Sequence, residues 1–218
     1  MPSETALPGF DHLLEVCRRK GLDVKQEPPL ASGAHPVSPT VAGQGMDPQL
    51  AAVHTRLRYL WVRDGLYLFP ERHPLRPDLH AVNAEWRTWE APFGSLLVFA
   101  KDDRLAYCYA LLPPAPGQAR GPRPVVWVDV YEDLYALPVA SSLDAFLDTF
   151  ARFLDAPPEE PRWKGSGGLP LPAFPWSASA LIARDTALMK LLRAGELDFL
   201  FQHNARARDW VAAHRGAA

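Results

Sequence analysis

The sequence is poor in cysteine, and the two that it has form no recognisable pair. Cys17 and Cys108 fall in different predicted elements and lack the short spacing of metal-binding or redox cysteines. A disulfide between them is geometrically feasible, but two reduced, buried thiols are the favoured interpretation. Burial of this kind raises the pKa of a thiol, so neither cysteine is expected to act as a nucleophile.

Long hydrophobic runs are also missing. No stretch approaches the ~20 apolar residues that a helix needs to cross a bilayer, and residues 1–4 lack the basic and apolar regions of a signal peptide. The formal net charge is only −2, so there is no global basic field to hold nucleic acid. We therefore expect a cytoplasmic protein that binds neither membranes nor nucleic acid.

Motifs of catalysis and metal binding are absent as well. The seven histidines show no H-x-x-x-H or H-E-x-x-H spacing. Ser95 lacks the second glycine of a nucleophile elbow. The glycines of segment 165–168 are not followed by the Lys-Ser/Thr pair of a phosphate-binding loop. The sequence therefore predicts no cofactor, no metal and no catalytic residue.

What the sequence does contain is a normal supply of apolar residues and an excess of proline. Hydrophobic residues make up 48% of the chain and charged residues 22%, as in a globular protein with a substantial core. The 23 prolines are roughly twice the typical ~5% share and cluster in connections. We therefore predict a single domain over 1–218, with a proline- and glycine-rich loop at 27–45.

The first half of the chain is predicted to hold two helices, a short strand and an aromatic turn. Their ranges follow from apolar spacing and from glycine and proline stops, and are 10–17, 48–63, 66–69 and 81–90. The second helix begins with Asp47 as its N-cap and Pro48 in its first position. Its buried stripe is expected to extend to Leu60.

The centre of the chain is predicted to form the sheet. Near-continuous apolar runs are typical of strands covered on both faces, and they occupy 95–100, 105–112 and 125–131, with a brief edge segment at 137–140. A helix follows, with Ser141 or Ser142 as N-cap and Asp144 in a capping-box arrangement. Residues 157–218 form a helical C-terminal extension. The fold class is therefore α+β: an antiparallel-rich mixed sheet flanked by helices, with extra N- and C-terminal helical segments.

Acidic residues are concentrated in one part of the chain. Between residues 129 and 160 there are eight acidic residues against a single base, Arg152, whereas the segment from residue 161 onward carries a net positive charge. A solvated helix face with acidic loops is one interpretation. The functional alternative is an acidic surface that steers a basic protein partner. The candidate partner-binding residues are Glu132, Asp133, Asp144 and Asp148.

This interpretation carries an expectation about substitutions. Reversing Asp144 and Asp148 to lysine should weaken partner binding, particularly at low salt. It should leave folding intact, because changes on a helix surface usually cost little.

The order of the central elements resembles that of a known family. In chain order there are an apolar strand with an Asp-containing turn, an aromatic strand, a strand leading to an acidic turn, and a Ser-capped helix, at 97–103, 107–109, 125–128, 131–133 and 142–147. In these features the chain resembles the SMI1/KNR4 (SUKH) superfamily. The helix from Asp47 would match the family's early helix, so the family-like core spans 46–156.

The resemblance implies a bacterial immunity protein. Such a protein binds a cognate toxin, often a nuclease or another cytoplasmic effector, and blocks it by occlusion. It would need no cofactor and no catalytic residue. Its partner would be a protein, here one with a basic surface that complements the acidic residues.

Two other classes of function stay open. A hydrolase-like enzyme would assemble its site from loops, and the side chains available for it are His73, His80, Glu132 and Asp133. A structural adaptor in a bacterial assembly would expose a large apolar patch, for which the candidates are Trp163, Trp176 and Trp210.

Overall fold

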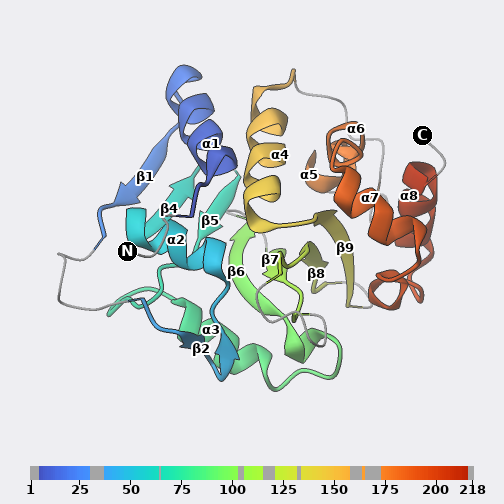
Figure 1. Cartoon of the computed structure of the whole chain (residues 1–218), viewed down its shortest axis with the longest axis horizontal. Helices are drawn as coiled ribbons and strands as arrows, with labels where there is room; N and C mark the ends of the chain where they lie inside the picture. The colour runs from blue at the N-terminus through green and yellow to red at the C-terminus, as the bar shows by residue number, and fades with distance from the viewer. Residues whose placement is uncertain are drawn as a thin grey trace.

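The computed structural model describes residues 5–29, 37–63, 65–102, 106–114, 121–131, 134–157, 164 and 173–215. Within these residues the chain has an α+β fold, in which helices flank an antiparallel sheet (Figure 1). The predicted fold class is therefore confirmed. Among the helices of the described ranges, none combines the length and apolar character that a membrane crossing requires.

The strands build one large sheet and one small hairpin. Their bounds are β1 (Val24–Glu27), β2 (Thr40–Val41), β3 (Gln44–Gly45), β4 (Tyr59–Val62), β5 (Leu66–Leu68), β6 (Leu97–Asp102), β7 (Cys108–Leu111), β8 (Val125–Asp129) and β9 (Tyr135–Ala140). The described part of the large sheet has seven strands in the order β1-β4-β5-β6-β7-β8-β9, and each neighbouring pair is antiparallel. The hairpin pairs β2 with β3.

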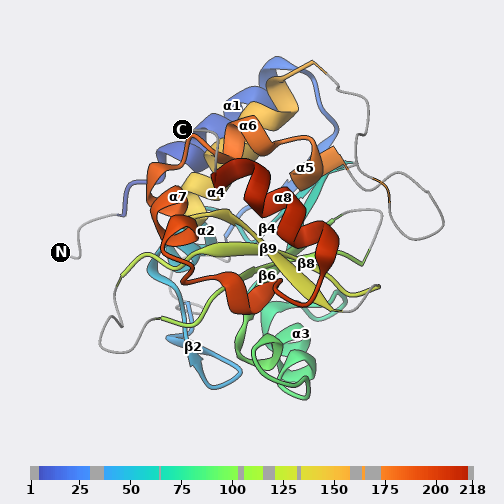
Figure 2. The same ribbon diagram turned by 90° about the vertical axis from the view of Figure 1, so that its right-hand side faces the viewer.

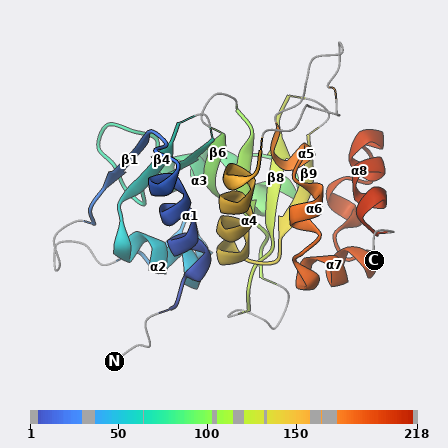
Figure 3. The ribbon, with the colours of Figure 1, turned by 90° about the horizontal axis from the view of Figure 1, so that it is seen from above.

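The helices are distributed along the whole chain. Their bounds are α1 (Pro8–Arg19), α2 (Pro48–Arg56), α3 (Leu79–Trp86), α4 (Leu143–Asp155), α5 (Ala173–Trp176), α6 (Ser179–Ile182), α7 (Thr186–Arg193) and α8 (Ala205–Arg215), with 3-10 turns η1 (Phe93–Ser95) and η3 (Asp198–Leu200). The views in Figures 1 and 3 place α1 and α4 side by side against one face of the sheet, with α5 to α8 continuing this layer toward β9. Figures 1 and 2 place α3 and the small hairpin at one end of the sheet, apart from this layer.

The helical layer is held to the sheet by apolar burial. In α1 the side chains of Phe10 and Leu13 are fully buried, and in α4 so is that of Phe146. Phe146 packs edge-on against Phe99 of β6, with ring centroids 5.7 Å apart. Burying side chains of this size contributes roughly 1.5–3 kcal/mol each, so the amphipathic stripes of α1 and α4 fix the position of the layer.

The strand register separates the two faces of the sheet. Leu68, Ala100 and Tyr109 are direct neighbours in one row, and the Tyr109 ring contacts Phe146 of α4 at 4.9 Å between centroids. That row therefore faces the helices. Because successive side chains of a strand point to opposite faces, the next row, which includes Tyr67, lies on the outer face of the sheet.

Several predicted elements are confirmed. The strands expected at 66–69, 95–100, 105–112 and 125–131 correspond to β5, β6, β7 and β8, and the edge segment at 137–140 belongs to β9. The first helix is present as α1, and Gly21 follows it with a positive φ of 62°, a conformation that glycine adopts at low cost.

The second helix is shorter than predicted. It begins as expected, because the Asp47 side chain accepts hydrogen bonds from the backbone nitrogens of Gln49 and Leu50. It ends at Arg56, however, and the residues from Tyr59 onward form β4. The leucines of this segment have helical spacing, so the sequence did not reveal the strand. In the strand, apolar side chains point to both faces of the sheet.

The proline- and glycine-rich range 27–45 is not wholly a loop. Residues 30–36 lie outside the described part of the chain, but β2 and β3 form a hairpin at its end. Ala42 and Gly43 connect them with φ values of 47° and 81°, as a two-residue type I′ turn requires.

Candidate functional site

Asp144, one of the predicted partner-binding residues, takes part in helix packing. Its Oδ1 atom accepts hydrogen bonds from the backbone nitrogens of Gly9 (2.9 Å) and Phe10 (3.1 Å) at the start of α1. The N-cap of α4 is Ser142, which accepts from Ala145. The predicted capping box with Asp144 is therefore wrong, since this carboxylate serves the neighbouring helix instead.

Asp148 is also occupied within the protein. One oxygen lies 2.7 Å from His12 Nδ1 in α1, and the other accepts from Arg152 Nε at 2.8 Å. Burial alone would raise the pKa of Asp148, but the hydrogen bonds from Arg152 and His12 outweigh it and lower the pKa. The expectation that reversing Asp144 and Asp148 leaves folding intact needs correction, because both side chains join α1 to α4.

Glu132 and Asp133 lie outside the described residues. Their role in partner binding stays a prediction.

The histidines considered for a loop-assembled site have separate partners. His73 Nδ1 accepts from the backbone nitrogen of Leu75, and its Nε2 lies 3.9 Å from Glu27. His80 Nε2 lies 4.0 Å from a different carboxylate, that of Glu71. In the described ranges, no three His, Cys, Asp or Glu side chains are grouped as metal ligands.

Two of the three tryptophans considered for an adaptor patch are buried. Trp176 is 3% exposed and Trp210 is 0% exposed, and their rings contact each other across the C-terminal helices. Trp163 lies outside the described residues. The two described tryptophans therefore belong to the core and form no surface patch.

Both cysteines are free thiols, as predicted; Cys17 is buried as expected, whereas Cys108 is only partly buried. Burial raises the pKa of Cys17 to about 11 and that of Cys108 to about 12. Both are protonated at neutral pH, which disfavours nucleophilic chemistry at either position.

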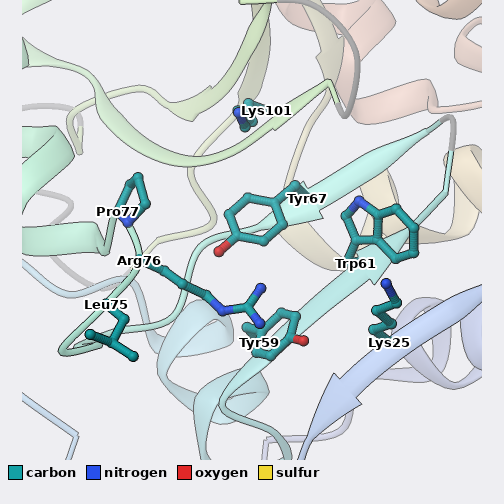
Figure 4. Close-up of a pocket in the computed structure, with 8 residues that line it drawn as sticks. All are labelled: Lys25, Tyr59, Trp61, Tyr67, Leu75, Arg76, Pro77 and Lys101. Carbon is teal, nitrogen blue, oxygen red and sulfur yellow. The ribbon is translucent and has the colours of Figure 1, made fainter.

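A pocket lies on the outer face of the sheet, at the β1 end. Its cavity volume is about 350 Å³, within the lower part of the range of ligand sites. Figure 4 shows the side chains around it. The lining residues are Lys25, Tyr59, Trp61, Tyr67, Leu75, Arg76, Pro77 and Lys101. We call this set the cation–aromatic pocket.

Strand pairing explains how distant parts of the sequence meet here. Lys25 of β1 is the direct neighbour of Trp61 in β4, which neighbours Tyr67 in β5, which in turn neighbours Lys101 in β6. These four side chains form one row across four strands on the outer face. Tyr59 lies two residues before Trp61 and points to the same face.

Each cation of the pocket lies over an aromatic ring. Lys25 Nζ is 4.5 Å from the centroid of Trp61, and Lys101 Nζ is 5.8 Å from that of Tyr67. Arg76, from the loop between β5 and α3, has its Cζ 4.6 Å from the Tyr59 ring. Such contacts contribute about 0.5–1 kcal/mol at exposed sites. They hold the cations in place without neutralising their charge.

The positive charge of the pocket meets no ion-paired carboxylate in the part of the chain that the structure describes. Among the described residues, no carboxylate comes within ion-pair distance of Lys25, Arg76 or Lys101. Glu27 is the acidic residue of β1, and it is paired with Arg58 at 3.6 Å as well as with His73. The pocket therefore presents three positive charges to solvent or to a ligand.

Tyr67 shows the mixed character of the site. Its side chain is 8% exposed. Burial raises the pKa of its hydroxyl, while the charge of Arg76 and a hydrogen bond with it act in the opposite direction. Arg76 is thus oriented by two tyrosines and directs its remaining donors to the pocket.

The loop 70–78 that carries Arg76 also exposes an apolar side chain at the rim. Leu75 is 89% exposed, although leucine is usually among the buried residues. The loop is fixed at both ends, because Asp78 accepts from the backbone nitrogen of His73 and Pro70 accepts from that of Leu79. Leu75 is therefore held out beside the three cations.

The site was not predicted from the sequence, because two of the strands that build it, β1 and β4, were not predicted. Tyr59 and Trp61 alternate with Leu60 and Val62 between two arginines, which is a strand signal of period two. The helical spacing of the preceding leucines obscured it. A second signal was Lys25, a basic residue at the centre of β1, in a segment with no other sequence feature of a site.

Fold and pocket together define an α+β protein with a positively charged pocket on the outer face of its sheet. Comparisons with protein-family models, with curated proteins and with solved structures found no match to this chain. The resemblance to the SUKH superfamily therefore stays a prediction.

Proposed function

We propose that this protein is a binding protein of the immunity type, which neutralises a toxin by occluding it, and that the cation–aromatic pocket makes the contact. The observation that carries the proposal is the set of three cations without carboxylate partners among the described residues. Charges held over aromatic rings keep their attraction for an outside anion. They are therefore suited to a partner.

The composition of the pocket supports a protein partner. Tyrosine, tryptophan and arginine are the residues most enriched among the energetic centres of protein interfaces. Here Arg76 and the partly buried Trp61 lie together, over and beside the buried Tyr59, and Leu75 projects at the rim. A single exposed leucine is common on protein surfaces, so the support for a protein partner comes from the tryptophan and the arginine.

The proposed contact differs from the one expected from charge runs. Asp144 and Asp148 face α1 and engage its backbone and His12. The side chains positioned for contact are basic, so the matching surface of the partner would be acidic at this point. The acidic loop at Glu132 and Asp133 is a separate candidate contact.

The proposal is tested with the protein encoded by the neighbouring reading frame. The two proteins are co-expressed and co-purified, and growth is measured with the neighbour alone and with both. We expect a stable complex and relief of growth arrest. Absence of both would contradict the function, whatever the role of the pocket.

The location of the contact is tested with Arg76→Glu combined with Leu75→Ala. We expect affinity to fall about a hundredfold, because two residues of the interface centre are lost. Arg184→Glu is the matched control, since this exposed arginine lies between α6 and α7, at the other end of the sheet (Figure 1). Equal affinity of the double variant and the control would remove the pocket from the proposal.

A further inference from the structure

The cations of the pocket are distributed along a row and do not converge on one point. Lys25 and Lys101 are separated by the strands that carry Trp61 and Tyr67. Neighbouring strands lie about 4.8 Å apart, so the Cα atoms of the two lysines are roughly 14 Å apart. Arg76 enters from the loop side, over Tyr59. The site offers a line of positive charge, which suits several anionic groups better than one.

We infer that the cation–aromatic pocket binds an acidic segment of a protein partner in extended conformation; this rests on the proposed function. In an extended chain, alternate side chains point the same way and recur about every 7 Å. Two or three carboxylates with this spacing match the separation of Lys25, Arg76 and Lys101. The side chains between them would meet the exposed Leu75 at the rim of the pocket.

The exposure of the rings distinguishes this ligand from a nucleotide or a single nucleic acid strand. Proteins that bind unpaired bases stack them on open aromatic faces. Tyr59 is only 3% exposed and Tyr67 only 8%, and Arg76 and Lys101 lie over them. Trp61 itself is covered by Lys25. The rings therefore serve to position cations and are not free to stack with bases.

The test uses the whole protein with synthetic peptides. The probe is an acetylated, amidated peptide Glu-Leu-Glu-Leu-Glu, and its control is Gln-Leu-Gln-Leu-Gln. Binding is followed by chemical-shift changes in ¹⁵N-labelled protein. We expect the acidic peptide to shift the indole signal of Trp61 and the amide signals of Lys25, Tyr67 and Lys101. The neutral peptide should bind at least about tenfold more weakly, since charge pairs across an interface supply the preference.

Variants place the binding in the pocket. Lys25→Glu with Lys101→Glu should reduce affinity for the acidic peptide at least about tenfold, and Lys25→Gln with Lys101→Gln should reduce it less, because loss of charge is milder than repulsion. Unchanged signals outside the pocket will show that each variant is folded. Equal affinity of the two peptides, or of the variants and the native protein, would overturn the inference.

Inorganic phosphate and ATP are tested in the same experiment as alternative ligands. Shifts of the same signals by either compound, without shifts by the acidic peptide, would identify a small-anion site and overturn the inference. The acidic peptide could show no binding while Arg76→Glu still abolishes binding of the neighbouring protein. In that case the inference of an acidic segment is wrong and the proposed function stands. If the peptide binds in the pocket but the neighbouring protein binds nowhere, the proposed function fails alone.

Discussion

Among the described histidines, His54 has a strongly unfavourable environment for its charged form. Its side chain is 6% exposed, and neither ring nitrogen makes a hydrogen bond of good geometry in the described part of the chain. Desolvation lowers the pKa of His54 from 6.5 to about 4, and the charge of Glu71 and the backbone at Arg58 and Leu57 only partly oppose this. The imidazole is therefore neutral in the folded protein at neutral pH.

This environment makes stability depend on pH. Because the pKa is lower in the folded state, the unfolded chain takes up the proton first as the pH falls below about 6.5. The loss of stability grows down to a pH of about 4 and then stops. A difference of this size corresponds to about 3 kcal/mol.

We predict that His54→Leu removes that part of the pH dependence. Urea unfolding of the native protein and the variant should be compared from pH 7.5 to pH 4. The difference in unfolding free energy between them should change by about 3 kcal/mol across this range in favour of the variant. A difference that stays constant with pH would show that His54 does not titrate with a lowered pKa.

At the scale of elements, the contact between α1 and α4 depends on close approach. A Cβ atom on Gly9 would come 2.1 Å from the carbonyl oxygen of Asp144, which no packing arrangement tolerates. Glycine is therefore required there, and Asp144 can reach the free backbone N–H groups at the start of α1. The negative charge also complements the positive end of the helix dipole.

We predict that Asp144→Ala lowers the free energy of unfolding by about 1–2 kcal/mol, as the loss of a helix N-cap does. Asp209→Ala is the control, because Asp209 is an exposed aspartate of α8, and its effect should stay within about 0.5 kcal/mol. Both values follow from urea unfolding at neutral pH. An effect of Asp144→Ala no larger than that of the control would mean that the contact with α1 adds nothing.

The elements that the sequence predicted well are those with strong local signals. The helix α4 has a serine cap and a regular apolar stripe, and β6 to β8 are continuous apolar runs. The strands β1 and β4 were missed because their stability comes from pairing with each other and with β5. Tertiary pairing of this kind overrides local preference, and no spacing along the chain reveals it.

The candidate site was hidden for the same reason. Its residues come from β1, β4, β5, β6 and one loop, and the row that joins Lys25 to Lys101 exists only after the strands pair. The acidic candidates, in contrast, were visible as a charge run. The structure uses two of them, Asp144 and Asp148, to join helices.

At the scale of the whole molecule, helices cover one face of the sheet (Figure 3). The strand residues that line the pocket point to the other face. The net charge of the chain is −2, so the positive pocket contrasts with its surroundings. The net negative charge of the molecule weakly repels an acidic partner, whereas the positive pocket attracts it. Electrostatics of this kind orients the encounter and acts mainly on the association rate.

We predict that association with the neighbouring protein slows about tenfold between roughly 0.05 M and 0.5 M NaCl, while dissociation changes little, because salt screens the approach of separated charges. Arg76→Glu should lower the rate at low salt and flatten its salt dependence. Arg184→Glu alters the net charge equally but away from the pocket, so the native salt dependence should persist. Stopped-flow measurements give these rates. Equal salt dependence of the association rate in both variants would show that the pocket does not steer the partner. An association rate that rises with salt would mean that like charges meet at the pocket.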